Sequence, residues 1–356
     1  MHRTAAPGRN RNRSLLGLAG AAALAIAMAG CSTPAAEGET SGGEVVFADY
    51  GGPTNESRQI AYFDSFQDET GTRVVSASLQ DAIMYSMLEG EEGDYDLIQV
   101  SSDSLIKYKE NLAVLPDGVP RADTFPEEIQ DYAVGGFLIG ITQGWLTDTF
   151  PDGGPQDWAD FFDTEKYPGK RAWPGAPGSY DASFELALLA DGVAPEDLYP
   201  LDLDRAVAKL DSIRDDLVFY ESYPEVQTLL STGSASIAVS VTGQFTALMN
   251  QGLDVTVQWN EAFLSPNFFV IPESAENKEA AYELATWLAD GERQAVFTER
   301  TFYGPANEAT FDYLPEDVAS KLPGGPGNDG SLYFDEQYRA DYLEELTSSY
   351  TEWLAG

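Results

Sequence analysis

Short apolar runs alternate with apolar residues at helical spacing along most of the chain. Residues 44–48 are predicted to form a strand, and Ile60, Phe63 and Phe66 lie on one face of a helix predicted over residues 57–70. Further strands are predicted over residues 73–77, 96–100, 137–145, 236–241 and 264–271. Further helices are predicted over residues 82–88, 104–110, 158–162, 183–190, 203–214, 277–289 and 335–354, with one more ending at residue 250. This alternation predicts an α/β fold with mainly parallel sheets flanked by helices.

Polar residues follow several of the predicted strands. In parallel α/β sheets, ligands bind beyond the carboxyl ends of the strands. The loops after the first three strands therefore contain candidate ligand contacts, which are Tyr50, Gly51, Gln80, Ser102 and Asp103. Structural roles remain open for them, because Tyr50 could cap a strand, Gln80 could be a turn residue and Asp103 could cap the next helix.

A later strand-to-helix turn contains Thr242 and Gln244. Backbone N–H groups are unpaired at the start of a helix, so such a turn can hold a carboxylate group. We therefore add Thr242 and Gln244 to the candidate binding residues.

The composition excludes several classes of protein. The 356 residues contain 59 Asp and Glu against 20 Lys and Arg, a formal net charge of −39. A strongly acidic chain without basic patches argues against nucleic acid or anionic lipid as a partner. The only histidine is His2, so a Ser-His-Asp triad and a histidine-based metal site are excluded, and we expect no metal and no cofactor. Neither a phosphate-binding loop nor a dinucleotide-binding motif is present.

The N-terminal residues show a basic head, then an apolar run at 15–29, then the single cysteine, Cys31. This order is typical of a secretory signal, and with a cysteine at the cleavage site it resembles a bacterial lipoprotein signal. Residues 1–30 would be removed, Cys31 would receive lipid, and the small polar residues 31–43 would form a flexible tether on the outer side of the cell membrane. A plain signal peptide without lipid on Cys31 remains an open alternative. The apolar run at 15–29 is shorter than the about 20 apolar residues that a membrane-spanning helix needs, which argues against such a helix.

Five segments occur in an order that is informative when they are taken together. They are residues 47–52 (FADYGG) with 62–74 (YFDSFQDETGTRV), 93–98 (GDYDLI), 157–170 (DWADFFDTEKYPGK), 271–281 (IPESAENKEAA) and 303–307 (YGPAN). In this order they resemble the solute-binding proteins of ABC transporters, of the spermidine/putrescine-binding type. The resemblance covers about residues 44–310.

The resemblance implies a two-lobed periplasmic-binding-protein fold, similar to type II, with a ligand cleft between two lobes. One lobe would comprise residues 44–142 and 270–308, the other residues 143–269, and a C-terminal helical segment, residues 309–356, would pack on both. Such a protein is a monomer and not an enzyme. It closes on a small solute and delivers it to an ABC permease, which works with its ATPase.

The resemblance also suggests further contacts and a class of solute. Polyamine-binding members hold amino groups with carboxylates and sandwich the methylene chain between aromatic rings. Tyr180 and Asp181 lie near the acidic position of the second lobe, Asn267 stands where an acid is expected, and Tyr303 lies in a family-like turn. Thr242 lies at a strand end where an aromatic residue is expected.

We therefore expect a small amine, either a polyamine or an amino-acid-like compound. Three alternatives remain open: a receptor for an organic acid, a receptor for ferric ion, and a lipid-anchored hydrolase that uses paired acids.

Overall fold

The predicted strands are present in the structure, and its described residues also form strands at 171–174, 217–220, 304–305 and 332–333, which were not predicted. The computed structural model describes residues 43–121, 127–176, 181–328 and 330–356. Its strands are β1 (Glu44–Asp49), β2 (Arg73–Ser78), β3 (Leu97–Ser101), β4 (Ala133–Leu146), β5 (Arg171–Pro174), β6 (Leu217–Tyr220), β7 (Ile237–Val241), β8 (Val255–Val270), β9 (Gly304–Pro305) and β10 (Leu332–Tyr333). The predicted leader and tether, with Cys31, lie outside the described residues except for Gly43.

The predicted helices are also present, whereas the helices at 127–130, 225–231, 291–301 and 316–319 were not predicted. They are α1 (Gly52–Arg58), α2 (Asp64–Thr70), α3 (Asp81–Leu88), α4 (Ser102–Tyr108), α5 (Glu127–Gln130), α6 (Trp158–Phe162), α7 (Ser183–Ala190), α8 (Leu203–Asp211), α9 (Glu225–Ser231), α10 (Thr242–Asn250), α11 (Lys278–Leu288), α12 (Gly291–Thr301), α13 (Glu316–Ala319) and α14 (Glu336–Ala355). A π-helical turn, Gln59–Phe63, joins α1 to α2, so the helix predicted over residues 57–70 consists of three pieces.

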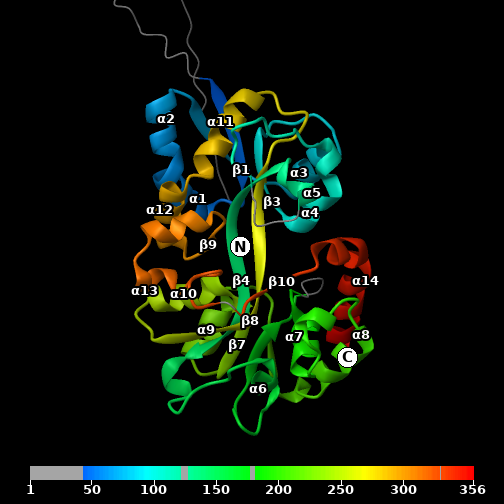
Figure 1. Ribbon diagram of the computed structural model, residues 1–356. Coiled ribbons are helices and arrows are strands. Elements are labelled where there is room, and N and C mark those ends of the chain that lie inside the picture. Colours follow the sequence, from blue (N-terminus) through cyan, green and yellow to red (C-terminus); the bar gives the residue numbers. More distant parts are fainter. Residues whose placement is uncertain (1–42, 122–126, 177–180, 329) are drawn as a thin grey trace, which may run out of the picture. The chain divides into compact units, whose positions relative to one another are not determined.

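The described strands form one sheet with the order β2-β1-β3-β8-β4-β7-β5-β6. The two short strands lie outside this order: β10 pairs with β8, and β9 pairs with β4. β1, β2 and β3 are parallel to one another, and so are β5, β6 and β7. The long strands β4 and β8 pair antiparallel with each other and link these two parallel groups. Figure 1 shows the two groups, one in blue and cyan and one in green, with β4 and β8 running from one to the other.

Each group of strands has its own hydrophobic core. Phe47, Phe63 and Phe269 belong to a cluster beside β1 and β3. Trp158 and Trp173, both fully buried, belong to a separate cluster beside β5 and α7. The structure therefore has two lobes, while the residue bounds that we gave for the lobes remain a prediction.

β4 and β8 are longer than the predicted strands over residues 137–145 and 264–271. The first half of β8 alternates apolar side chains with the polar side chains of Thr256, Gln258 and Asn260, and it lacks the apolar run that marks a buried strand. Pairing with β4 extends this half as a strand. The predicted lobe bounds meet at residues 142/143, within β4, and at residues 269/270, at the end of β8.

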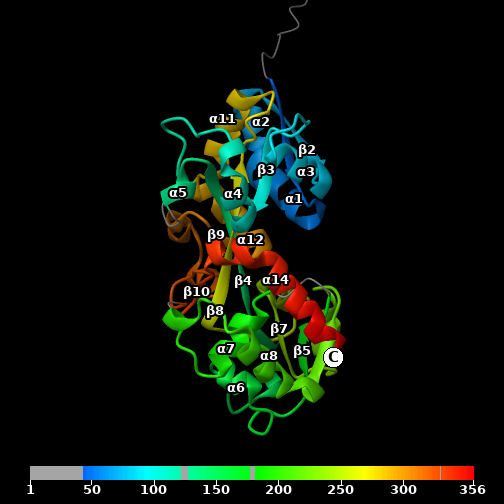
Figure 2. The same ribbon diagram turned by 90° about the vertical axis from the view of Figure 1, so that its right-hand side faces the viewer.

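The C-terminal helix α14 packs on one lobe and also reaches the other. The Asp335 side chain caps α14 by accepting a hydrogen bond from the Tyr338 N–H at 2.9 Å. Leu346, Tyr350 and Trp353 are buried in the core beside β5 and α7. The helix also contacts α4 of the β1–β3 lobe, and Figure 2 shows it in red between the two lobes.

Candidate functional site

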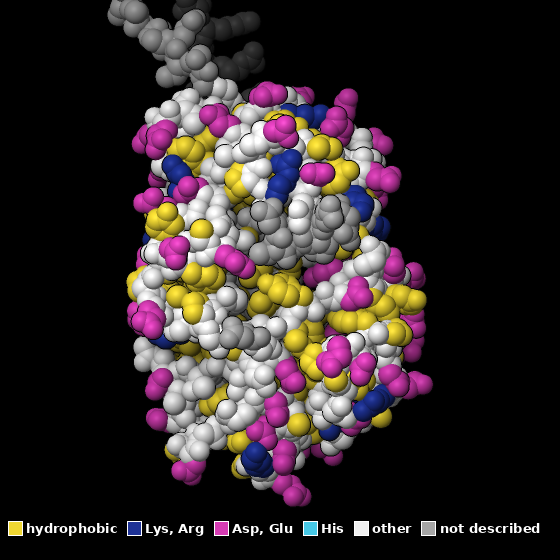
Figure 3. Space-filling model, in the orientation of Figure 1, with side chains coloured by type: hydrophobic (Ala, Val, Ile, Leu, Met, Phe, Trp, Pro, Cys, Tyr) yellow, Lys and Arg dark blue, Asp and Glu magenta, His cyan; other side chains and the backbone are white. Residues whose placement is uncertain are grey.

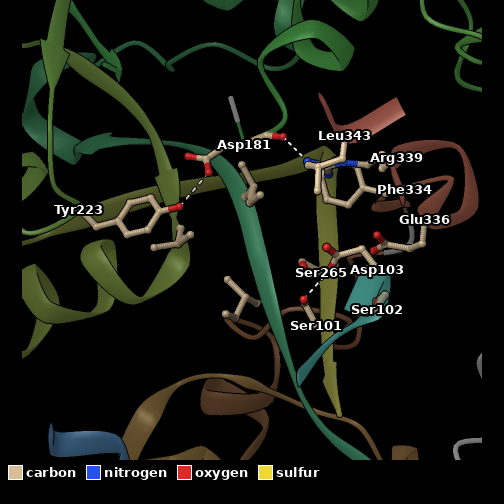
Figure 4. A pocket seen from close by; sticks show the side chains of 13 residues that line it. Ser101, Ser102, Asp103, Asp181, Tyr223, Ser265, Phe334, Glu336, Arg339 and Leu343 are labelled. Atoms are coloured by element: carbon tan, nitrogen blue, oxygen red, sulfur yellow. Dashed lines mark hydrogen bonds between the residues drawn. The ribbon is translucent and has the colours of Figure 1, made fainter. Parts of the chain in front are cut away.

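A cavity of about 310 Å³ lies beside the long strands β4 and β8 (Figure 4). Pockets for small molecules usually measure about 300–1,000 Å³, so this one suits a small solute. Its polar lining residues are Ser101, Ser102, Asp103, Asp181, Tyr223, Ser265, Glu336 and Arg339, and its apolar ones are Ile139, Ile141, Val241, Phe334 and Leu343.

The first wall of the cavity comes from the end of β3 and the start of α4. Residues 97–100 of β3 are buried, so the chain emerges from the core at Ser101. Asp103 lies in the first turn of α4, where a carboxylate interacts favourably with the helix dipole. The Ser101 hydroxyl donates a hydrogen bond to the Asp103 carboxylate. Asp103 does not occupy the N-cap position, because that residue is Ser101.

The second wall comes from loops before α7 and α9. Asp181 has a positive φ of 46°, a conformation that costs energy for a residue with a Cβ. The Tyr223 hydroxyl donates to Asp181 Oδ1 at 2.8 Å, and Arg339 Nη2 donates to the Asp181 carbonyl oxygen at 2.6 Å. These two bonds hold Asp181 at the edge of the cavity.

The third wall is the N-terminal half of α14. Glu336, Arg339 and Leu343 are spaced i, i+3 and i+7, so all three lie on one face of the helix and line the cavity. The sequence patterns did not identify these three residues as candidate ligand contacts, because the motifs of the resemblance end before α14. The i, i+3, i+7 spacing was visible in the sequence, but only packing identifies which face of α14 meets the cavity.

Charge is concentrated around α14. The pKa of Glu336 is raised to about 7, with burial as the largest cause; Asp103 and Glu185 also raise it, whereas Arg339 and a hydrogen bond with Ser102 oppose the rise. The side chain of Glu185 is fully buried, and burial raises its pKa while Arg339 opposes that shift. Arg339 Nε lies 4.0 Å from Glu185 Oε1. The site therefore presents a guanidinium group and several carboxyl groups beside an apolar wall.

The sequence of the chain matches a known protein family. The family described as "Bacterial extracellular solute-binding protein" matches residues 61–323. The chain belongs to this family.

Individual relatives agree with the assignment. The chain is 28% identical over 319 residues to a gamma-aminobutyric acid-binding protein of Pseudomonas aeruginosa, with 86% of this chain and 89% of the relative covered. The structure of the Atu4243-GABA receptor has a TM-score of 0.77 and 29% identity, covering 87% of this chain and 97% of its own. The structure of AgtB of A. tumefaciens R10 in complex with agropinic acid has a TM-score of 0.70 and 27% identity. The match covers 88% of this chain and 99% of AgtB.

This solute-binding protein has the two-lobed periplasmic-binding-protein fold, as predicted. It is a receptor that binds a small molecule for an ABC transporter, and it is not an enzyme. Its family is extracellular. Among the described residues, no helix combines the length and apolar character that a membrane crossing needs. Within those same ranges, no three His, Cys, Asp or Glu side chains are arranged to hold a metal ion.

The structure places three of the predicted contacts, Ser102, Asp103 and Asp181, in one cavity of the receptor. Tyr50 is not among the residues that line that cavity, and it is 64% exposed; desolvation raises the pKa of its hydroxyl most, followed by Asp81, Tyr85 and Asp103. Gly51 has a positive φ of 73° in the turn after β1, and Gln80 is an exposed residue before α3. Tyr180 lies outside the described residues.

The other predicted contacts have structural partners outside the cavity lining. Thr242 is buried, and its hydroxyl oxygen accepts from the Gly140 N–H at 3.4 Å. Gln244 Oε1 accepts a hydrogen bond from Gln227 at 2.8 Å, Asn267 Oδ1 accepts one from Gln99 at 3.0 Å, and Tyr303 stacks on Phe137. Ligand contact by these residues stays a prediction.

Proposed function

We propose that this receptor captures a small amine or amino-acid-like solute and delivers it to an ABC permease that works with an ATPase. The observation that carries the proposal is the cavity where Asp103, Glu336 and Asp181 stand beside the apolar side chains of Ile139 and Ile141. An ammonium group that leaves water needs a charged acceptor, and an apolar wall favours burial of the attached methylene groups. The names of two relatives, which are gamma-aminobutyric acid receptors, support the same class.

The cavity also supports capture by closure of the lobes. Asp103 follows β3 of one lobe, whereas Asp181 and Tyr223 belong to the lobe of β5–β7. A solute that touches both walls stabilises the conformation in which the walls are close. Release at the permease would then require the lobes to separate.

Thermal-shift screening followed by calorimetry tests the proposed solute class. The panel contains putrescine, spermidine, γ-aminobutyric acid, α-amino acids, dicarboxylic acids and sugars. A ligand at 100 times its dissociation constant stabilises the folded state by about 2.7 kcal/mol, which a thermal shift detects. We expect stabilisation by amines or amino acids. Stabilisation by dicarboxylic acids or sugars alone would contradict the proposal.

We also propose that lipid on Cys31 anchors the receptor to the outer face of the cell membrane. The basic head, the apolar run and the single cysteine support this proposal. The anchor would keep a monomeric receptor close to its permease. Expression of the full chain with Cys31→Ser in a bacterium tests it, and we expect the variant to leave the membrane fraction and to lose incorporation of labelled fatty acid. Equal labelling of both proteins would contradict the anchor.

A further inference from the structure

The helix α14 contributes charged groups of both signs to the cavity. Resting on the solute class proposed above, we infer that α14 recognises both ends of a zwitterionic solute: Arg339 binds its carboxylate group, and Glu336 together with Asp103 binds its ammonium group. Figure 4 shows the side chains of Arg339, Glu336 and Asp103 around the same cavity. The helix α14 thus binds the solute in addition to packing on the body of the receptor.

Arg339 is held in place by surrounding groups. Its Nη2 donates to the Asp181 carbonyl oxygen at 2.6 Å, and its guanidinium carbon lies 3.8 Å from the centre of the Phe334 ring. Its Nε lies 4.0 Å from the fully buried Glu185. A guanidinium fixed in this way loses little side-chain entropy on binding, and its planar donors match a carboxylate. Burial raises the pKa of Glu185, and Arg339 opposes that rise.

Glu336 and Asp103 approach the cavity from different elements. Glu336 begins α14, Asp103 lies in the first turn of α4, and these two helices are in contact. Two neighbouring carboxylates repel each other, and a cation between them removes the repulsion. The charged and polar groups facing Glu336 are Arg339 on its own helix, Asp103 and Ser102 on α4, and Glu185 on α7. An ammonium group is therefore favoured at the side of the cavity where Asp103 and Glu336 meet.

The spacing of the two recognition groups favours a chain-like solute. Glu336 and Arg339 are three residues apart, which corresponds to a rise of about 4.5 Å along the helix. Ile139, Ile141 and Leu343 supply apolar surface in the same cavity. A short methylene chain between an ammonium and a carboxylate group suits this arrangement. A diamine would bring its second ammonium group toward Arg339, and a dicarboxylate would bring a negative group toward Glu336 and Asp103.

Calorimetry with γ-aminobutyric acid, 5-aminovalerate, β-alanine and putrescine tests the inference. We expect the wild-type receptor to prefer an amino-carboxylate over putrescine. Arg339→Gln should weaken binding of that amino-carboxylate by at least tenfold. The ratio of its affinity to the affinity for putrescine should fall by more than that factor. Glu336→Gln should weaken both kinds of ligand. The matched controls are Arg205→Gln on α8 and Glu352→Gln on the exposed part of α14, and both should bind as the wild type does.

Each outcome separates the inference from the proposed function. If the wild-type receptor prefers putrescine, or if Arg339→Gln leaves the ratio of the two affinities unchanged, the inference is overturned and the amine receptor stands. If none of these four ligands binds to the wild type, the inference fails, and if spermidine and the α-amino acids of the thermal-shift panel fail as well, the proposed function fails with it. Thermal unfolding of each variant without ligand shows whether it folds. Arg339→Lys, which keeps the charge but lacks the planar fork, gives a second test with an intermediate loss expected.

Discussion

Arg58 of α1 forms an ion pair with Asp49 at the end of β1, and each side chain is only 1% exposed. Arg58 Nη2 also donates to Gln99 Oε1 at 2.7 Å, and Gln99 Nε2 donates to Asn267 at 3.0 Å. The guanidinium carbon lies 5.3–5.6 Å from the ring centres of Phe47, Phe137, Phe269 and Phe297. This buried network joins β1 and β3 to the long strand β8.

Removal of one member of the pair should destabilise the receptor strongly. Asp49→Ala leaves Arg58 charged in an apolar surrounding, so we expect the free energy of unfolding to fall by about 3–5 kcal/mol. Urea unfolding followed by tryptophan fluorescence measures the loss. Glu44→Ala is the matched control, because Glu44 pairs with Arg73 in an exposed ion pair at the other end of β1 and should cost at most about 1 kcal/mol. Equal losses would contradict the prediction.

Glu336 should make the stability of the ligand-free receptor depend on pH. Its pKa is about 7 in the folded protein against 4.5 ordinarily, so the folded state binds the proton more tightly than the unfolded state. The resulting stabilisation is lost as the pH rises from about 4.5 to about 7. Glu336→Gln should therefore raise the melting temperature at about pH 8 more than at about pH 5. The same shift at both pH values would show that Glu336 does not titrate in this range.

Two leucines of α14 should separate stability from binding. Leu346 is fully buried, whereas Leu343 is 44% exposed and lines the cavity. Leu346→Ala should lower the free energy of unfolding by about 2–5 kcal/mol, because it leaves a void in the core. Leu343→Ala should lower it by less than about 1 kcal/mol and should weaken ligand binding instead. Urea unfolding and calorimetry measure the two effects, and a reversed pattern would contradict this packing of α14.

Gly144 in β4 should not tolerate a side chain. A Cβ at this position would lie 2.7 Å from Cε1 of Phe245, so Gly144→Ala should cost about 1–3 kcal/mol of stability. A Cβ at Gly243 in α10 would meet Tyr303 at an ordinary 3.6 Å. Gly243→Ala is therefore the control, and we expect it to leave the unfolding midpoint nearly unchanged. A loss as large for Gly243→Ala as for Gly144→Ala would rule out the clash.

On the face that Figure 3 shows, the acidic side chains of the described residues do not gather in one place. Asp and Glu side chains are scattered over both lobes on the face shown in Figure 3. The even spread agrees with the sequence, where the acidic residues are distributed along the chain. The carboxyl groups that matter for the candidate site are distinguished by burial in the cavity, which charge counting does not show.

The sequence by itself determined most of the alternating strands and helices, the strand end followed by Ser102 and Asp103, and the resemblance to solute-binding proteins. These features depend on local periodicity, on turn residues and on short motifs, which a single stretch of chain contains. Only the tertiary structure decided that β4 and β8 pair antiparallel with each other and that Glu336 and Arg339 face the same cavity as Asp103. Apolar periodicity shows which face of α14 is buried, but the partner that covers its charged face is set by packing between residues far apart in the chain.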